Sequence, residues 1–230
     1  MSQKHRLAVA TRNAGKLREF AALLGDLPVD LVSPADYVRL ELPPEEAGSY
    51  AANALTKART VAAATGLVAL ADDSGLEVKA LGGRPGVCSA RFAGEGAGDA
   101  ANNEKLLALL KEVPWEERVA RFRCVLALVL PPGVEPSGQA RAIPPETVVE
   151  GICEGIIAFE PRGEHGFGYD PLFYLPAYGC TMAELSETVK NRVSHRARAF
   201  ARLRPLLEQI FLPPGDDWRV KVGPGAGPDD

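Results

Sequence analysis

The sequence predicts a mixed α/β fold, with one β-sheet flanked by helices, from three observations. A short apolar run at residues 5–10 precedes apolar side chains at helical spacing, from Leu17 to Leu24. An alanine-rich stretch at 49–65 then leads into a second short apolar run at 67–71. Beyond residue 118 the pattern changes to strands separated by Pro- and Gly-rich turns. Strand–helix units followed by an antiparallel meander favour one mixed sheet flanked by helices, with function in the loops at the strand ends.

The first half of the chain gives the clearest helix. Residues 49–65 carry Ala51, Ala54, Ala58 and Val61 on one stripe, and Gly66 stops the helix. The following run, 67–71, is fully apolar and short, which is typical of a buried strand. We expect this strand to end abruptly at the polar sequence 72–75, which its carboxyl end would display.

The second half alternates loops and strands. Residues 82–98 are predicted to form a loop, and Asp99 to open a helix whose Leu106, Leu107 and Leu110 point inward. Strands are expected at 118–130 and 147–159, with a wide turn at 131–138 and a strand near Ala140. Residues 161–171 form a glycine-rich loop, and 200–210 a terminal helix. We therefore expect one domain at 1–212 and a flexible Pro/Gly-rich tail at 213–230.

Composition narrows the class of protein. The chain has 30 acidic and 26 basic residues, a net charge of -4, which disfavours a protein that coats nucleic acid. The N-terminal apolar run is too short for a signal segment or a membrane span, and the four cysteines form no C-x-x-C pair. We expect a soluble, cytoplasmic protein with reduced thiols. Because the three histidines lack metal-ligand spacing, any metal is expected on carboxylates.

The segment Thr11-Arg12-Asn13-Ala14-Gly15-Lys16 joins the first strand to the first helix. Free backbone N–H groups and the helix dipole favour a bound anion at such a turn, and Lys16 adds a positive charge. It is not the usual phosphate loop, since Leu17 follows the lysine where a hydroxyl residue would bind magnesium. An Asn-capped helix with solvent-facing Arg12 and Lys16 is the alternative.

Carboxylates cluster around two places. Asp72 and Asp73 follow the second apolar run, and adjacent carboxylates there could hold Mg²⁺ and accept a proton from water. An Asx-turn shaped by Ser74 and Gly75 is the alternative. Glu45 and Glu46 precede the helix on which Asn53 and Lys57 share a face, so Lys57 could contact a phosphoryl group. A surface lysine with two solvated acids is the commoner arrangement.

Two later motifs could recognise a base. In 166–171, glycines flank Phe167, whose ring could lie flat against a base while Asp170 accepts from the base's edge. At 194–196, Ser194 is a plausible helix N-cap, with His195 and Arg196 facing outward as donors. A tight aromatic turn and a simple cap are the alternatives.

Read in order, these segments resemble the inosine triphosphatase family, also called dITP/XTP or non-canonical purine nucleoside triphosphate pyrophosphatases. The resemblance covers about 5–211 and rests on "ATRNAGK", "EEAG" with "NALTKA", "ADDSGLEV" with "LGGRPGVCSARFAG", "GFGYDPLF" and "SHRARA". It implies a long mixed sheet with two lobes around a central active-site cleft, a homodimer, Mg²⁺ as cofactor and a nucleoside triphosphate substrate. No nucleic-acid or membrane partner is expected.

The resemblance also implies roles for individual residues. Asp73 and Glu46 would bind magnesium, Asp73 would accept the proton, and Asp72 and Lys57 would complete the catalytic set. The implied substrate contacts are Thr11, Arg12, Asn13, Ala14, Gly15, Lys16, Ser74, Phe167, Gly168, Tyr169, Asp170, Lys190, His195 and Arg196.

The expected reaction is in-line attack by water on the α-phosphorus, with pyrophosphate leaving towards Lys16 and Lys57. Donors near His195 and Arg196 would favour a 6-oxo purine over adenine, since adenine's amino group would meet donor against donor. Two alternatives stay open: a related pyrophosphatase for another modified base or a pyrimidine, and a nucleotide sensor that binds without turnover. Nucleic-acid binding is a weaker third.

Overall fold

The computed structural model describes residues 4–37, 40–45, 48–131 and 143–212, and within them one mixed sheet organises the chain. The sheet has seven strands in the order β2-β1-β3-β4-β5-β6-β7. β1 pairs in parallel with β2 and β3, and every later pairing is antiparallel, so the predicted mixed sheet is confirmed. The strands are β1 (His5–Val9), β2 (Val29–Val32), β3 (Val68–Val78), β4 (Val119–Val129), β5 (Glu146–Ile157), β6 (Phe173–Leu175) and β7 (Cys180–Thr181).

Helices begin and end where the sequence places capping residues. In α2 (Tyr50–Thr65), Ser49 accepts from the backbone N–H of Ala52, and Gly66 closes the helix with a left-handed φ of 67°. The remaining α-helices are α1 (Ala14–Leu24), α3 (Asp99–Leu109), α4 (Glu187–Val193) and α5 (His195–Phe211). The short 3-10 helices are η1 (Pro34–Asp36), η2 (Lys79–Leu81), η3 (Gly86–Arg91), η4 (Trp115–Glu117), η5 (Asp170–Leu172) and η6 (Met182–Glu184).

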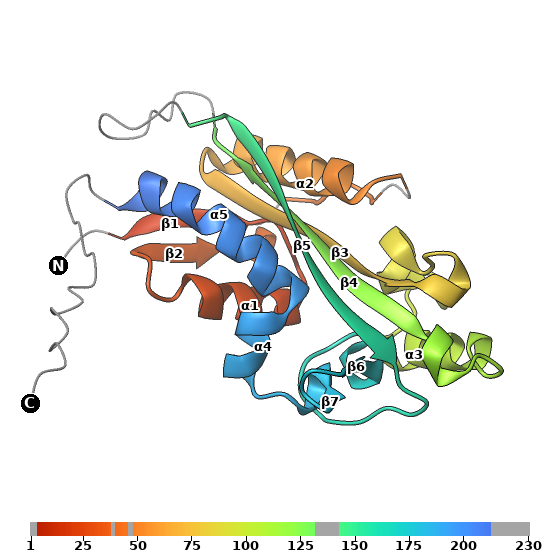
Figure 1. Ribbon diagram of the computed structural model, residues 1–230. Helices are drawn as coiled ribbons and strands as arrows, with labels where there is room; N and C mark the ends of the chain where they lie inside the picture. The colour runs from red at the N-terminus through yellow and green to blue at the C-terminus, as the bar shows by residue number, and fades with distance from the viewer. Residues whose placement is uncertain (1–3, 38–39, 46–47, 132–142, 213–230) are drawn as a thin grey trace, which may run out of the picture.

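Helices cover both faces of the sheet (Figure 1). α2 packs on β3 and β4 at one face, while α5 packs on β4 and β5 at the other. The alternation along β3 matches this arrangement, because Ala69 and Ala71 face α2 whereas Leu70 belongs to the cluster formed with α1 and α5. Consecutive β3 residues therefore reach different sides of the sheet.

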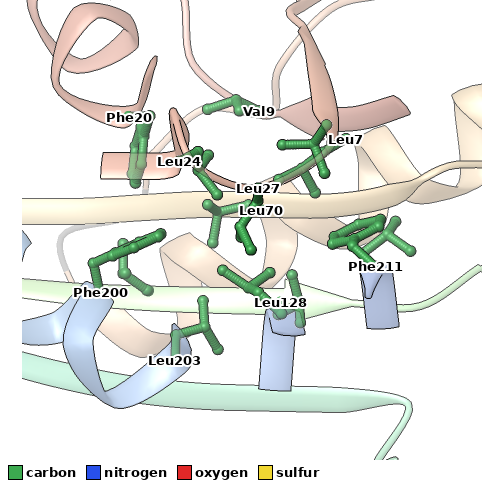
Figure 2. Packing of buried hydrophobic residues seen from close by; sticks show 14 of the residues in the cluster. Leu7, Val9, Phe20, Leu24, Leu27, Leu70, Leu128, Phe200, Leu203 and Phe211 are labelled. Carbon is green, nitrogen blue, oxygen red and sulfur yellow. The ribbon is translucent and has the colours of Figure 1, made fainter. Parts of the chain in front are cut away.

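The largest leucine- and phenylalanine-rich cluster fixes α1 and α5 against the sheet. Figure 2 shows Leu7 of β1, Phe20 of α1, Leu70 of β3, Leu128 of β4 and Phe200 of α5 pointing toward one another, and all five are buried. Burying each such side chain contributes about 1.5–3 kcal/mol relative to leaving it exposed. This packing sets the start of α1 and the start of α5 beside β3.

Some expectations need correction. The stretch 82–98 contains η3 rather than loop alone, and α4, a two-turn helix between the caps Ser186 and Ser194, was not anticipated. Leu106 and Leu110 are buried as predicted, but Leu107 only partly. The expected turn at 131–138, the strand near Ala140 and the tail at 213–230 fall mainly or wholly outside the described residues. The four cysteines are free thiols.

Candidate active site

β3 continues past the end of β1, and this leaves an open edge of β3 between Leu70 and Glu77, where an isolated bridge to Pro85 begins. The register of β1 with β3 ends at Val9 opposite Leu70, followed by a bond from the Ala10 N–H to the Leu70 carbonyl at 2.8 Å. On its other edge β3 stays paired with β4 as far as Val78. The next β3 residues therefore lie opposite the turn into α1.

The expectation that Asp72 and Asp73 follow the end of a strand is wrong. Both lie inside β3, where they pair with Leu126 and Val125 of β4. The apolar run ends at Ala71, but pairing with β4 holds the polar continuation extended, and this also removes the alternative of an Asx-turn. As neighbours in a strand, the two carboxylates point to opposite faces of the sheet.

Asp72 lies on the face that carries α1 and α5, fully buried and bound by cations. Its Oδ2 accepts from Arg196 Nη2 at 2.8 Å and from Ser74 Oγ at 3.1 Å, and lies 3.0 Å from Lys16 Nζ. Burial raises the pKa of Asp72, but Lys16 and Arg196 together hold that pKa far below its usual value. This carboxylate is therefore ionised at neutral pH, and its Oδ2 atom is shared by Arg196, Ser74 and Lys16.

The turn into α1 has the predicted strand-to-helix form. Asn13 caps the helix by accepting from the Lys16 N–H at 3.0 Å, and Thr11 Oγ1 accepts from the Asn13 N–H at 3.2 Å. Ala14 begins α1 and is exposed. A β-carbon on Gly15 would lie 2.5 Å from the Phe167 ring, so the ring packs directly on the helix backbone.

Arg12 differs from the other residues of this turn. Its side chain donates to the carbonyl of Leu40 at 2.9 Å. It therefore ties the segment before Glu45 to the turn.

Asp73 lies on the α2 face, where it meets an amide and an ammonium. Asn53 Nδ2 donates to Asp73 Oδ2 at 2.9 Å, and Lys57 Nζ lies 3.4 Å from Asp73 Oδ1 and 2.7 Å from Glu45 Oε1. Asn53 and Lys57 are both buried, so the inward face of α2 is wider than the alanine stripe, and a surface position for Lys57 is excluded. Arg91 of η3 donates to the Glu45 carbonyl at 3.1 Å and holds that segment in place.

The surroundings give Asp73 a different proton affinity from Asp72. Burial raises the pKa of Asp73, and the nearby Glu45 carboxylate adds to this increase against the opposing effect of Lys57. For Glu45, burial also raises the pKa, but Lys57 outweighs it and the pKa is lowered. Asp73 is thus the carboxylate of this group with a raised affinity for a proton.

Oxygen donors at this edge are chemically suited to magnesium. Glu45 and Asp73 both approach Lys57, and Asp72 Oδ1 is buried without a hydrogen-bond partner among the described residues. Hard carboxylate oxygens of this kind are the ligands that Mg²⁺ prefers. Glu46 lies outside the described residues, within which no group of three metal-binding side chains forms. The ligand assignment of Glu46 therefore stays a prediction.

Beside the Asp72 cluster lies a cavity of about 110 Å³ that we call the aromatic pocket. Phe122 and His195 stack there, with ring centres 4.7 Å apart and an interplanar angle of 15°. The pocket is lined by Asn13, Lys16, Glu19, Ser74, Gly75, Leu76, Ser89, Ala90, Asp99, Asn102, Phe122, Phe167, Gly168, Tyr169, Asp170, Lys190, His195 and Arg196.

His195 and Arg196 are buried, so the expectation that they face outward is wrong. Ser194 caps α5 as predicted, but the first turn of the helix lies against β5. Gly151 permits this approach, because a β-carbon there would be 2.2 Å from the His195 carbonyl oxygen. Burial, reinforced by the positive charge of Arg196, lowers the pKa of His195 well below its usual value, so the ring is neutral.

A chain of alternating charges extends from Asp72 along the pocket. Arg196 pairs with Glu19 as well as Asp72, Lys190 lies 2.8 Å from Glu19, and Lys190 lies 2.5 Å from Asp170. Asp170 Oδ2 also accepts from the Phe167 N–H at 2.9 Å. Each buried charge therefore has an opposite partner, which limits the cost of burial.

Sequence reasoning missed several residues of this site. Glu19 was not singled out, although it follows Lys16 by three positions on the predicted helix and so shares its face. Phe122, Ser89 and Asn102 were also missed. Phe122 lies in the alternating half of its strand, a signal for burial but not for a pocket.

Fold and site together define an α/β protein whose sheet carries a cluster of buried charges beside an aromatic pocket. The model of the Ham1 family matches residues 7–206. The chain belongs to the Ham1 family.

Named relatives agree with this assignment. A dITP/XTP pyrophosphatase of Geobacter sulfurreducens is 51% identical over 86% of this chain and 94% of the relative. A dITP/XTP pyrophosphatase of Pseudomonas aeruginosa is 50% identical over 90% of this chain and 99% of the relative.

Solved structures show the same fold. A HAM1 protein from Coxiella burnetii has a TM-score of 0.75 and 39% identity, covering 89% of this chain and 99% of that one. A nucleoside-triphosphatase, dITP/XTP pyrophosphatase, from Mycobacterium abscessus has a TM-score of 0.66 and 46% identity, covering 87% of this chain and 99% of that one.

Among the helices within the described ranges, none combines the length and apolar character needed to cross a membrane.

Proposed function

We propose that this protein hydrolyses non-canonical purine nucleoside triphosphates, ITP, dITP and XTP, to the monophosphate and pyrophosphate. This reaction removes them from the nucleotide pool before they enter DNA or RNA. The proposal rests on two ion pairs at the open edge of β3, Lys16 with Asp72 and Lys57 with Asp73. This edge lies beside the aromatic pocket. The names of the relatives, dITP/XTP pyrophosphatase, support it.

The turn into α1 is the proposed triphosphate site. Backbone N–H groups at a helix N-terminus favour anions, and Thr11 and Asn13 add polar side chains there. Lys16 and Lys57 contribute positive charge from the two faces of β3, the first beside Asp72 and the second beside Asp73. A triphosphate lying across the open edge would contact both lysines, which would receive the leaving pyrophosphate.

Asp73, with Glu46 as predicted and Glu45 nearby, would hold Mg²⁺. When bound, the ion neutralises phosphate charge and makes a water molecule more acidic. Asp73 accepts the proton of the attacking water as the new bond to the α-phosphorus forms and the bond to the bridging oxygen of pyrophosphate breaks. Its raised pKa suits this role, since a base is most effective near the working pH.

The aromatic pocket would select the base. His195 Nδ1 and Arg196 Nε are buried without hydrogen-bond partners among the described residues, and both residues line the pocket. A donor from this pair would match the 6-oxo group of hypoxanthine or xanthine but oppose the amino group of adenine. Phe167 and Tyr169 supply aromatic surface for the ring.

A substrate comparison tests the function. The protein is incubated with ITP and with ATP, each with and without magnesium, and the products are identified by ³¹P NMR. We expect inosine monophosphate and pyrophosphate from ITP only with magnesium, and slow turnover of ATP. Equal rates on ITP and ATP would remove the base selectivity, and release of inorganic phosphate in place of pyrophosphate would overturn the reaction class.

The assembly and location are also proposed. The resemblance to the inosine triphosphatases implies a homodimer, and the relatives are bacterial enzymes of nucleotide metabolism, which supports a cytoplasmic location. Light scattering coupled to gel filtration measures the mass directly. A mass near that of the 24.5 kDa chain would contradict the homodimer.

A further inference from the structure

The first turn of α3 holds the loop that carries Phe167 and Tyr169. Asp99 Oδ2 accepts from the Gly168 N–H at 2.6 Å, and Asn103 Nδ2 donates to the Gly168 carbonyl at 2.9 Å. Asp99 and Asn103 are four positions apart, so both lie on one side of the helix. Together they bind both polar backbone atoms of one glycine.

The same turn holds a second wall of the aromatic pocket. Asn102 is buried, and its Oδ1 accepts from the Ala93 N–H at 2.7 Å while its Nδ2 donates to the Ala90 carbonyl at 3.2 Å. Ala90 and the adjacent Ser89 line the pocket. One helical turn therefore bonds to the segments that form two pocket walls.

Gly168 is the position where such bonds have most effect. It has a φ of 64°, a left-handed conformation, and it lies between two residues that both line the pocket. A glycine link without side-chain packing leaves the directions of its neighbours weakly fixed. The Tyr169 hydroxyl then donates to the Ser89 carbonyl at 2.8 Å, so the position of Gly168 also decides how the two walls meet.

We propose that Asp99 and Asn103 are positioning residues that set the shape of the aromatic pocket by fixing Gly168. The proposal rests on the proposed function, because pocket shape is read out as preference for the base. Their effect falls on substrate binding and base preference, since the groups that perform the phosphate chemistry lie at the open edge of β3. Neither residue is required to contact the reacting atoms.

Kinetics of four variants test this role. Asp99→Ala and Asn103→Ala are each expected to raise KM for ITP about tenfold and to lower the ITP-to-ATP ratio of kcat/KM, with kcat within about twofold. Asp99→Asn is expected to recover most of the loss, because its amide oxygen can accept the Gly168 N–H. The matched control is Glu104→Ala, an exposed acidic residue on the same helix, which is expected to behave as wild type.

The double variant adds a sharper test. Because both side chains hold the same glycine, Asp99→Ala combined with Asn103→Ala is expected to cost little more than either alone. Fully multiplicative effects on KM would contradict a shared role through Gly168.

The outcomes separate this proposal from the proposed function. Wild-type protein that releases no pyrophosphate from ITP overturns the function. Active wild type with an unchanged KM and base ratio in both alanine variants overturns the positioning role.

Amide hydrogen exchange in the wild type tests the proposal without substrate, and it applies even if the variants fold poorly. The Gly168 amide hydrogen of the wild type is expected to exchange with solvent at least about tenfold more slowly than an unprotected amide, measured by NMR. Exchange at the unprotected rate would show that the bond to Asp99 does not persist and would overturn the proposal.

Discussion

On the two faces of β3, the pKa values of two neighbouring aspartates are shifted in opposite directions. Asp72 meets Lys16 and Arg196 on the α1 and α5 face, and these cations lower its pKa despite complete burial. Asp73 meets Asn53, Lys57 and the Glu45 carboxylate on the α2 face, where burial raises its pKa. Residues of one type, adjacent in one strand, are therefore fitted for different tasks. Asp72 organises a fixed array of charges, while Asp73 can exchange a proton.

Replacing Asp73 with asparagine is expected to have the largest effect. Asp73→Asn removes the proposed proton acceptor, which is also a proposed magnesium ligand, and we expect kcat for ITP to fall on the order of a thousandfold. Stability should be unchanged or slightly higher, because the neutral amide carries no cost of a buried charge. Steady-state kinetics and urea denaturation measure the two quantities.

The control for this variant is Asp30→Asn, a surface aspartate paired with Lys4. Near-normal turnover by Asp73→Asn would contradict the catalytic role. A large loss of stability would contradict the division of tasks between the two faces.

Replacing Asp72 with asparagine should affect stability first. Asp72→Asn leaves Lys16 and Arg196 without their shared carboxylate, and breaking a buried ion pair from one side costs about 3 kcal/mol of unfolding free energy. Urea denaturation provides the value, again with Asp30→Asn as the control. If Asp72→Asn were as stable as wild type, the charge array would not be the structural element described.

The sequence predicted β1, α1, α2, α3, β4, β5 and α5 in order, but it missed β2, β6, β7 and α4, and it could not predict this asymmetry. The apolar run stops at Ala71, and nothing local indicates that pairing with Leu126 and Val125 carries the strand onward. The burial of Arg196 depends on Glu19, a residue 177 positions away. Contacts over such separations arise from packing of α1 and α5, which local periodicity does not specify.

Capping was predictable for the opposite reason. Gly66 and Ser194 act through their own backbone neighbours, and both were found at the expected helix ends. The residue types of the site could likewise be read from motifs. The inward orientation of His195 and Arg196 could not be predicted, because it depends on the close approach of α5 to Gly151 of β5.

Acid titration of stability gives the smallest expected effect. Because the pKa of Asp72 is lowered in the folded protein, its contribution is present above the ordinary value of 3.8 and is lost as the pH falls below it. The raised pKa of Asp73 acts in the opposite sense, with its contribution lost as the pH rises through the folded value.

The wild type should therefore lose unfolding free energy more steeply than Asp72→Asn on acidification, by up to about 1.4 kcal/mol per pH unit for one proton. Urea denaturation over a series of acidic pH values measures both slopes. Parallel curves for the two proteins would show that Asp72 does not titrate as described.

The position of attack is the most direct test of the account. When ITP is hydrolysed in ¹⁸O-labelled water with magnesium, the arrangement around Asp73 predicts one ¹⁸O atom in the inosine monophosphate and none in the pyrophosphate, as measured by mass spectrometry. Label in pyrophosphate or inorganic phosphate would place the attack on another phosphorus and contradict the mechanism.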